Sequence, residues 1–254
     1  MKKMIAILAA VMLFWGASAS ADTLDFLKPF WMQMMDGVSN TASGKIPENV
    51  TVTCADERLT VEACGVLLEN DYSAEAHVYA VLKNTGSERL PIRSVQMTVL
   101  GANGNTLHQE NYVSYMPSVV EPGETMLVSE WMYDFVKEID KVHSIQISVE
   151  TASRVNEKWK QLGDVRAWLD GDYLCVEFTN TTEKTLFGVI CAATVSDANG
   201  QILDMMMQSP YDTDDLGIAQ GSSIVWRKRL EDAATLKIGT DAVCKAWAYR
   251  MEDL

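Results

Sequence analysis

Apolar and polar residues alternate with a period of two along most of the chain after residue 75, which is the pattern of strands rather than helices. In one such stretch Val78, Ala80 and Leu82 share one face. Turn residues such as Asn103-Gly104 and Asp170-Gly171 separate the stretches, because they supply the positive φ angles that tight hairpins require. The predicted strands are residues 77–83, 94–100, 125–132, 144–149, 165–169, 173–178, 189–195, 222–230 and 242–249.

The strand pattern occurs twice, at a separation of 96 residues. Asn84-Thr85 recurs as Asn180-Thr181, and Ala102-Asn103-Gly104 recurs as Ala198-Asn199-Gly200. Six or seven short strands in roughly 90 to 100 residues predict an immunoglobulin-like β-sandwich, so the sequence predicts an all-β protein with two such domains in tandem. The expected organisation is a β-sandwich at residues 49–151, a linker at 152–162 and a second β-sandwich at 163–254.

The order of these motifs resembles that of a known class of domain. An alternating strand, Asn-Thr, a second alternating strand, Asn-Gly and then a Gly before a further strand are similar to the small bacterial extracellular β-sandwich domains of the FxLYD and CARDB-like type. The resemblance covers most of residues 72–150 and 172–250. At the pentapeptide that names the first family the chain reads Met97-Thr-Val-Leu-Gly101 and Ala193-Thr-Val-Ser-Asp197, with agreement at the last place of the second copy. The resemblance implies a secreted or envelope module for contacts or spacing, with no catalytic residues to carry over.

The N-terminus predicts a secretory signal peptide at residues 1–21. Lys2 and Lys3 precede the apolar run 4–15, and Ala19-Ser20-Ala21 is a small-residue cleavage site. The run is shorter than the roughly 20 residues that a helix needs to cross a bilayer, which disfavours the alternative of a membrane anchor. The mature protein is therefore expected to be secreted or periplasmic, without stable membrane insertion.

Residues 22–48 combine an aromatic and methionine-rich stretch with a segment of Gly, Ser, Asn and Thr from Gly37 to Gly44. This composition predicts a short amphipathic helix followed by a flexible tether. Two interpretations stay open: the helix packs on the first sandwich, or it docks on a partner or a membrane surface.

The net charge excludes one class of partner. The chain has 21 Lys and Arg against 35 Asp and Glu, a net charge of −14, and removal of residues 1–21 with their two lysines leaves −16. Such a charge repels phosphate backbones and anionic membranes, so nucleic acid is not expected as a partner. Basic ligands and divalent cations are compatible with it.

The five cysteines are candidates for disulfides because the protein is expected to be exported. Cys54 and Cys64 flank what the pattern presents as a first hairpin, and Cys191 and Cys244 are assigned to one core face. We expect the pairs Cys54–Cys64 and Cys191–Cys244, with buried cysteines acting as small apolar residues as the alternative.

Motifs for catalysis, cofactors and metals are missing from the sequence. His77, His108 and His143 are isolated from one another, and no nucleophile elbow or metalloprotease motif is present. The acidic loop Tyr211-Asp-Thr-Asp-Asp215 offers oxygen ligands for Ca²⁺, but it lacks the bend Gly and the distal Glu of a calcium loop, which favours an exposed charge cluster. We expect no catalytic residues, no cofactor and no metal site.

Two functions follow from these observations. The favoured one is a noncatalytic secreted protein whose two domains contact a protein or carbohydrate of the envelope or surroundings, and exposed aromatic or apolar patches on corresponding faces would support it. Trp131, Tyr133 and Trp226 either form an aromatic binding strip or belong to the core. The alternative is a hydrolase or metal-dependent enzyme at the domain junction, with a polar pocket that contains His143 or the carboxylates of residues 212–215.

Overall fold

The structure of the chain is a computed structural model, and it describes residues 50–69, 75–132, 141–153, 157–208, 217–230 and 238–253. These residues belong to one compact unit, Gly44–Leu254. The predicted signal peptide 1–21, the amphipathic segment 22–48, Tyr133 and the acidic loop 211–215 lie outside the described residues. Within the described part of the chain, no helix is long and apolar enough to cross a membrane.

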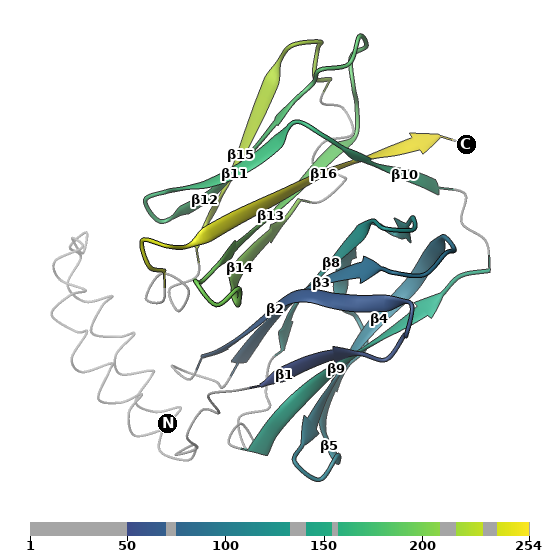
Figure 1. Cartoon of the computed structure of the whole chain (residues 1–254), viewed down its shortest axis with the longest axis vertical. Helices are drawn as coiled ribbons and strands as arrows, with labels where there is room; N and C mark the ends of the chain where they lie inside the picture. The colour runs from purple at the N-terminus through teal and green to yellow at the C-terminus, as the bar shows by residue number, and fades with distance from the viewer. Residues whose placement is uncertain are drawn as a thin grey trace, which may run out of the picture. The chain divides into compact units, whose positions relative to one another are not determined.

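The strands of the first half are β1 (Thr51–Cys54), β2 (Leu59–Glu69), β3 (Glu75–Asn84), β4 (Leu90–Gly101), β5 (Thr106–Glu110), β6 (Ser114–Met116), β7 (Val119–Val120), β8 (Thr125–Met132) and β9 (Val142–Thr151). They form two sheets (Figure 1): one has the order β1-β9-β4-β5, with β7 paired to β4, and the other has the order β2-β3-β8-β6. Strand β1 runs parallel to β9, and the described pairings of the other strands in this half are antiparallel.

The strands of the second half are β10 (Glu157–Leu162), β11 (Val165–Asp170), β12 (Tyr173–Thr179), β13 (Val189–Ser196), β14 (Ile202–Met207), β15 (Ser223–Arg229) and β16 (Val243–Asp253). One sheet has the order β10-β16-β13-β14 and the other β11-β12-β15. These orders correspond to β1-β9-β4-β5 and to β2-β3-β8 of the first half, except that β10 runs antiparallel to β16 whereas β1 runs parallel to β9. The prediction of an all-β protein is confirmed, and the paired sheets fit the β-sandwich class.

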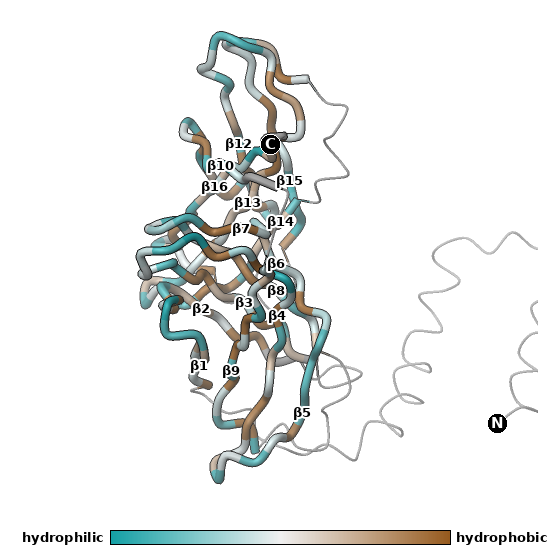
Figure 2. Tube along the Cα trace, turned by 90° about the vertical axis from the view of Figure 1, so that its right-hand side faces the viewer, coloured by the Kyte–Doolittle hydropathy of each residue, from teal (hydrophilic) through white to brown (hydrophobic). Residues whose placement is uncertain are grey.

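The strands follow the alternation of the sequence. Along β4 buried and partly exposed residues alternate for most of its length, and Figure 2 shows hydrophobic segments along the strands with hydrophilic ones at many of the turns. The two Asn-Gly turns end in Gly104 and Gly200, whose φ angles of +75° and +83° lie in the region that favours glycine. Residues 157–162, which we assigned to the linker, instead form strand β10 and pair with β16.

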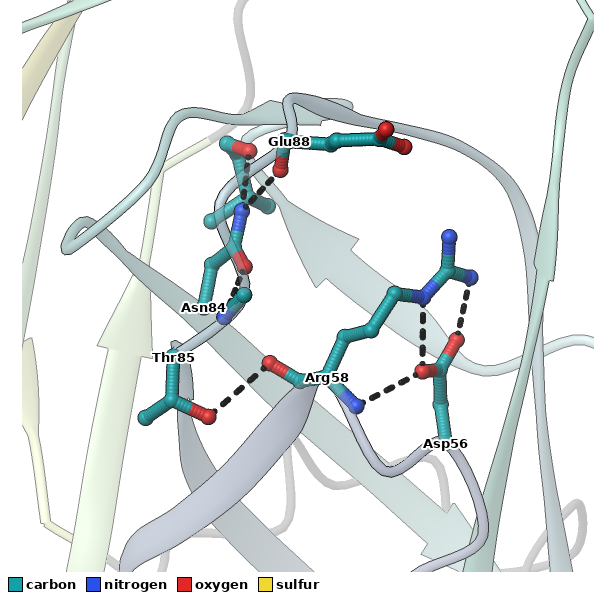
Figure 3. A network of polar contacts seen from close by, with 7 residues as sticks. Asp56, Arg58, Asn84, Thr85 and Glu88 are labelled. Atoms are coloured by element: carbon teal, nitrogen blue, oxygen red, sulfur yellow. Dashed lines mark hydrogen bonds and ion pairs between the residues drawn. The ribbon is translucent and has the colours of Figure 1, made fainter.

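A buried asparagine closes the same corner in each half. Asn84, at the end of β3, is fully buried. Its Nδ2 donates to the carbonyl oxygens of Glu88 at 2.8 Å and Val120 at 3.0 Å, and its Oδ1 accepts the N–H of Gly86 at 3.0 Å (Figure 3). The side chain thereby fixes the loop after β3 to strand β7.

Asn180 forms the equivalent bonds in the second half. Its Nδ2 donates to the carbonyl oxygens of Lys184 at 2.8 Å and Ile218 at 2.7 Å, and its Oδ1 accepts the N–H of Thr182 at 3.0 Å. In the second half an isolated β-bridge joins Leu186 to Ile218, and it corresponds to the pairing of β4 with β7 in the first half. These matching bonds are what a duplicated domain predicts.

A second polar contact ties the turn after β1 to the same corner. The carbonyl oxygen of Arg58 accepts the N–H of Thr85 at 2.8 Å and its hydroxyl at 3.2 Å (Figure 3). The Arg58 side chain donates to the Asp56 carboxylate, with 2.6 Å between Nη2 and Oδ2, and this bond lowers the pKa of Asp56. The turn is thus held by its own ion pair and by the Asn-Thr motif of β3.

The core is not confined to each half. One cluster of buried apolar residues lies within the first half, but the other joins Leu67, Tyr79 and Leu127 of the first half to the buried residues of the second. All eight residues of β13 are buried, which means that both faces of its sheet are covered. Strand β14 contacts both β2 and β3. The sheet β2-β3-β8-β6 therefore packs on the sheet that contains β13 and β14.

Two features fix this packing between the halves. The Tyr249 hydroxyl donates to the carbonyl oxygen of Thr125 at 3.1 Å, and the Trp159 indole donates to the Ser118 hydroxyl at 2.7 Å. A Cβ atom at Gly65 of β2 would lie 1.7 Å from the carbonyl oxygen of Ile202, so the close approach of β2 and β14 requires glycine at that position. These contacts hold the two halves together, and so they disfavour the freedom between domains that a linker would give.

Candidate functional site

A chain of buried polar side chains crosses from the first half to the second. Asp204, on the edge strand β14, is fully buried. Its Oδ1 accepts hydrogen bonds from the Tyr79 hydroxyl of β3 at 3.2 Å and from the Lys228 ammonium of β15 at 2.7 Å. The Tyr79 hydroxyl also lies 3.2 Å from Nδ1 of the buried His77. One carboxylate thus joins strands of three different sheets.

The same groups protect the edge of β14. The backbone N–H of Met205 donates to Asp204 Oδ1 at 2.7 Å, and its carbonyl oxygen accepts a bond from the Lys228 ammonium at 3.1 Å. Both backbone groups of Met205 are therefore satisfied by side chains. An unpaired edge strand invites another chain, and this arrangement blocks strand addition at Met205.

A cleft of about 650 Å³ opens beside this polar chain. Its walls are Ser129–Trp131 of β8, Met205–Gln208 at the end of β14, Trp226–Lys228 of β15 and Ser114 of β6. The volume lies within the roughly 300–1,000 Å³ that ligand pockets occupy. The cleft belongs to both halves, because β6 and β8 come from the first and β14 and β15 from the second.

The structure brings together two of the three residues of the predicted aromatic strip. Trp131 and Trp226 both line the cleft. Trp131 is 36% exposed, and its ring lies 3.9 Å from the ring of His77, centroid to centroid. Trp226 is partly buried and also packs against the core. Trp226 therefore belongs in part to the core and both rings line a cavity, while ligand binding by them stays a prediction.

Glu130 is the acidic residue of the cleft wall. Its Oε2 accepts the N–H of Ser114 at 3.1 Å. Partial burial raises the pKa of Glu130, the neighbouring Glu110 carboxylate adds to this, and the bonds from backbone N–H groups act in the opposite direction. Among the described residues, no cation forms an ion pair with Glu130.

The two cations of the wall are already compensated. The Lys228 ammonium lies 2.7 Å from Asp204 Oδ1. Arg227 Nη2 lies 2.7 Å from Asp170 Oδ2, and the guanidinium lies over the ring of Tyr173, 4.5 Å from its centroid. The charges of Lys228 and Arg227 are directed to these partners.

The predicted disulfides are not formed, since all five cysteines are free thiols. The pair Cys191–Cys244 is wrong because of the register of β13 and β16: Cys191 lies opposite Ala248 and Cys244 opposite Val195. Four residues along a strand correspond to about 13 Å. A disulfide needs Cα atoms within roughly 7 Å of each other.

The pair Cys54–Cys64 fails for a different reason. The expected hairpin does not exist, because β1 pairs with β9 and β2 pairs with β3 in the other sheet. Both thiols pack against the core of the first half, and burial raises the pKa of each. The cysteines act as small apolar residues, which was the alternative.

The sites that an enzyme was expected to use are not part of this cleft. His143 is exposed on β9 and does not line it, and residues 212–215 lie outside the described residues. Within the described part of the chain, no three His, Cys, Asp or Glu side chains form a group that could hold a metal ion.

Among the described residues, exposed aromatic or apolar patches do not lie on corresponding faces of the two halves. The outer face of β3, with His77 and Tyr79, is buried against the second half. The equivalent face of β12 is exposed at Tyr173, which is 39% accessible, and Val225 of β15, which lies opposite Glu177 on the same face, is 46% accessible. The two copies therefore use the same face differently.

Sequence reasoning missed Asp204 and Lys228. The available signal was a single carboxylate inside the apolar run Ile202–Met207, since a charge in a buried strand needs a partner. Nothing in the sequence marked Lys228 as that partner, because 24 residues separate the two and their contact depends on how the sheets pack.

Comparisons with known proteins add little. No protein-family model matches the chain, and no curated protein matches it. A crystal structure of red sea bream transglutaminase is similar over 78% of this chain and 29% of that chain, at 13% identity and with a TM-score of 0.22. At such a score the likeness carries no argument about fold or activity, and the cleft must be interpreted from its own residues.

Proposed function

We propose that the chain is a noncatalytic bacterial binding protein, secreted or periplasmic, built from two immunoglobulin-like β-sandwich domains of the FxLYD and CARDB-like type. Its ligand is a component of the cell envelope or the surroundings, a protein or a carbohydrate, and it binds in the cleft between the halves. The predicted signal peptide at residues 1–21 supports export. The matching strand orders of the two halves support the tandem domains.

The observation that carries this function is the cleft itself. A cavity of about 650 Å³ with two tryptophans, Trp131 and Trp226, and the methionines of β14 has the mixed apolar and polar wall of a ligand site. Tryptophan and methionine contribute large contact areas to binding. The bonds of Asp204 to Tyr79 and Lys228 link β3, β14 and β15, and so fix the strands that carry this wall.

The same geometry favours binding over catalysis. The buried groups beside the cleft neutralise one another, since the Asp204 carboxylate accepts the Lys228 ammonium and the Tyr79 hydroxyl. Glu130 is the only acidic residue among the described residues that line the cleft, and no histidine or cysteine lines it beside Glu130, whereas acid–base and nucleophilic mechanisms generally use a second activated group. The alternative of an enzyme at the domain junction has no comparable observation in its favour.

The experiment is co-sedimentation of the purified protein with envelope fractions of the producing cell, at low and high salt, beside an equally acidic control protein. Trp131→Ala removes the exposed ring of the cleft, and Tyr112→Ala removes an aromatic ring that is 90% exposed and does not line it. We expect salt-resistant pelleting of the wild type and of Tyr112→Ala, and its loss in Trp131→Ala. Recovery of the wild type in the supernatant at both salts, or pelleting of Trp131→Ala like the wild type, would refute the proposal.

A further inference from the structure

A second, smaller cavity lies in the first half. It has a volume of about 280 Å³, and its walls are Arg93–Val95 of β4 and the segment 111–115, which leads from β5 into β6. The Tyr115 hydroxyl joins the two walls, because it donates to the carbonyl oxygen of Arg93 at 3.1 Å. The cavity shares Ser114 with the cleft between the halves, and its other lining residues are different. Its volume is just below the roughly 300–1,000 Å³ of ligand pockets, so it fits one unit of a larger ligand.

We infer that this cavity holds one residue of a neutral glycan, which stacks on the ring of Tyr112 and continues over the uncharged outer face of the sheet β1-β9-β4-β5. The inference goes beyond the proposed function, because it assigns a second binding surface outside the cleft and the class of ligand that this surface takes.

Tyr112 provides the apolar contact of the site. Its side chain is 90% exposed. The backbone around it is fixed by Glu110, whose Oε1 accepts the N–H of Asn111 at 2.9 Å and that of Tyr112 at 3.1 Å. Gln109 adds a bond from its Nε2 to Asn111 Oδ1 at 2.9 Å. A phenol ring held in this way offers a large contact area to the C–H face of a sugar ring at little cost in entropy.

The polar groups of the wall supply hydrogen bonds without a net charge. Arg93 Nη1 lies 3.0 Å from Glu150 Oε1, and the Ser94 hydroxyl donates to Glu150 Oε2 at 3.1 Å. This ion pair uses one of the five N–H donors of the guanidinium, which leaves donors for ligand hydroxyl groups. Because Glu150 balances Arg93, the wall favours a neutral, hydroxylated ligand over a carboxylate or an ammonium.

The outer face of the adjoining sheet continues this chemistry (Figure 1). Uncharged polar residues lie opposite one another across its strands: Thr53, Gln146, Thr98 and Gln109 in one row, and Ser148 and Gln96 in the next. Residues of the other parity, such as Val99 and Ile145, belong to the core. Neighbouring strands are about 4.8 Å apart, so the row of four extends over about 14 Å. Ser94, two residues before Gln96 on β4, connects this face to the cavity.

The composition of the face identifies the kind of partner. The chain has 21 Lys and Arg and 35 Asp and Glu, yet neither row contains a charged residue. Ser, Thr and Gln side chains both donate and accept hydrogen bonds, as sugar hydroxyl groups do. On residues 94–100 of β4 and 144–150 of β9, Leu100 is the only apolar residue that faces outward, whereas the centre of a protein interface is apolar. A net charge of −14 disfavours anionic polymers.

The test is titration calorimetry of the full chain with three neutral probes, cellopentaose, maltopentaose and chitopentaose. A fourth probe, fully deacetylated chitopentaose, has the same backbone as chitopentaose but carries ammonium groups. The comparison of these two forms tests the preference for a neutral ligand without any substitution. We expect at least one neutral probe to bind, and the deacetylated form to bind at least about 10-fold more weakly than the tightest neutral probe.

Two variants test the surface. Tyr112→Ala removes the exposed ring, and Gln146→Glu places a charge in the middle of the row at nearly constant shape. Gln201→Glu is the matched control, because it makes the same change at an exposed residue in the turn before β14. We expect about a 10-fold loss of affinity in Tyr112→Ala and in Gln146→Glu, and none in Gln201→Glu. Thermal melting checks the fold of each variant.

The outcomes separate this inference from the proposed function. If no neutral probe binds, or if Gln146→Glu and Gln201→Glu lose affinity equally, the inference is overturned and pelleting through the cleft is unaffected. If Trp131→Ala loses the sugar and Tyr112→Ala keeps it, the sugar binds in the cleft, which overturns the inference and leaves the proposed function in place. If Gln146→Glu instead dissociates a dimer in sedimentation, a second copy covers this face and the inference fails. Hydrogen bonds to exposed groups give weak affinity for a glycan, so Tyr112→Ala is still expected to pellet with envelope fractions.

Discussion

Asn84 and Asn180 provide the sharpest test of how the two halves are built. Replacement of Asn84 by Ala removes two donated hydrogen bonds, to Glu88 and Val120, and one accepted from Gly86. The Val120 residue is fully buried, so its carbonyl group loses a partner away from water. An unsatisfied buried acceptor costs about 1–3 kcal/mol.

The other two bonds lie in a partly exposed loop, where water replaces the lost partner. Each then contributes about 0.5–1.5 kcal/mol, which gives about 2–6 kcal/mol for Asn84→Ala in total. Domains of this kind have a free energy of unfolding of about 5–15 kcal/mol. Asn84→Ala therefore removes a large share of the stability.

Asn180→Ala removes the equivalent three bonds, with distances that differ by at most 0.3 Å, and a fourth that Asn180 Oδ1 accepts from the Thr182 hydroxyl at 2.7 Å. It is therefore expected to cost as much as Asn84→Ala or up to about 1.5 kcal/mol more. The assay is urea unfolding followed by tryptophan fluorescence, with the midpoint and slope fitted for each variant. Asn111→Ala is the matched control, since its side chain is exposed and accepts one bond from Gln109. A loss below about 1 kcal/mol for Asn84→Ala, or a difference above about 2 kcal/mol between the two variants, refutes the reasoning.

The remaining predictions concern the contacts between the halves and the thiols. Lys228→Met leaves the Asp204 carboxylate buried without its cation and is expected to cost about 3–5 kcal/mol in urea unfolding, while Lys160→Met on the surface costs little. Gly65→Ala forces a Cβ against Ile202 and is expected to lower the melting temperature, whereas Gly163→Ala meets nothing within 4 Å and leaves it unchanged. A thiol assay in denaturant without reductant is expected to find five thiols, and Cys191, whose pKa burial raises to about 12, is expected to resist alkylation of the native protein at pH 9; a count of three or one contradicts the structure.

Local sequence patterns predicted where most strands lie, whereas long-range packing determines which of their faces are buried and which residues meet. The alternation around Val78 and Leu174 located β3 and β12, since the residues of one parity form the core of each half. The same alternation failed for β14, where Ile202–Met207 is apolar on both faces because both are covered. Strand β10 was missed because its polar residues alternate around Trp159, which packs against the other half.

The site was predictable only in part. Trp131 and Trp226 were recognised as aromatic residues of late strands, but nothing in the sequence says that β8 and β15 meet at one cleft. The cysteine pairs failed because a disulfide depends on register, and a spacing in sequence does not give the register of β13 with β16.

The stacking of the two halves explains why equivalent faces carry different residues. Gly65, which lies opposite Tyr79, admits the backbone of β14, whereas the equivalent position in the second half is Trp168, which lies opposite Cys175. An indole at that place prevents the approach that glycine allows, so the exposed face of β11-β12-β15 does not accept another sheet in the same way.

The sheet of β4 and β9 carries polar residues on the face that corresponds to the buried face of β13 and β16. The face of β13 and β16 that covers the first half carries Ile190 opposite Tyr249, while the corresponding positions on β4 and β9 are Ser94 and Glu150. Glu150 accepts a bond from the Ser94 hydroxyl at 3.1 Å and pairs with Arg93 at 3.0 Å on an exposed surface, so burying this face would require both charges to lose water, which the Ile-Tyr pair does not require. Among the described residues, the packing of one half on the other therefore uses the face of β13 and β16 that carries Ile190 and Tyr249, and not the face of β4 and β9 that carries Ser94 and Glu150.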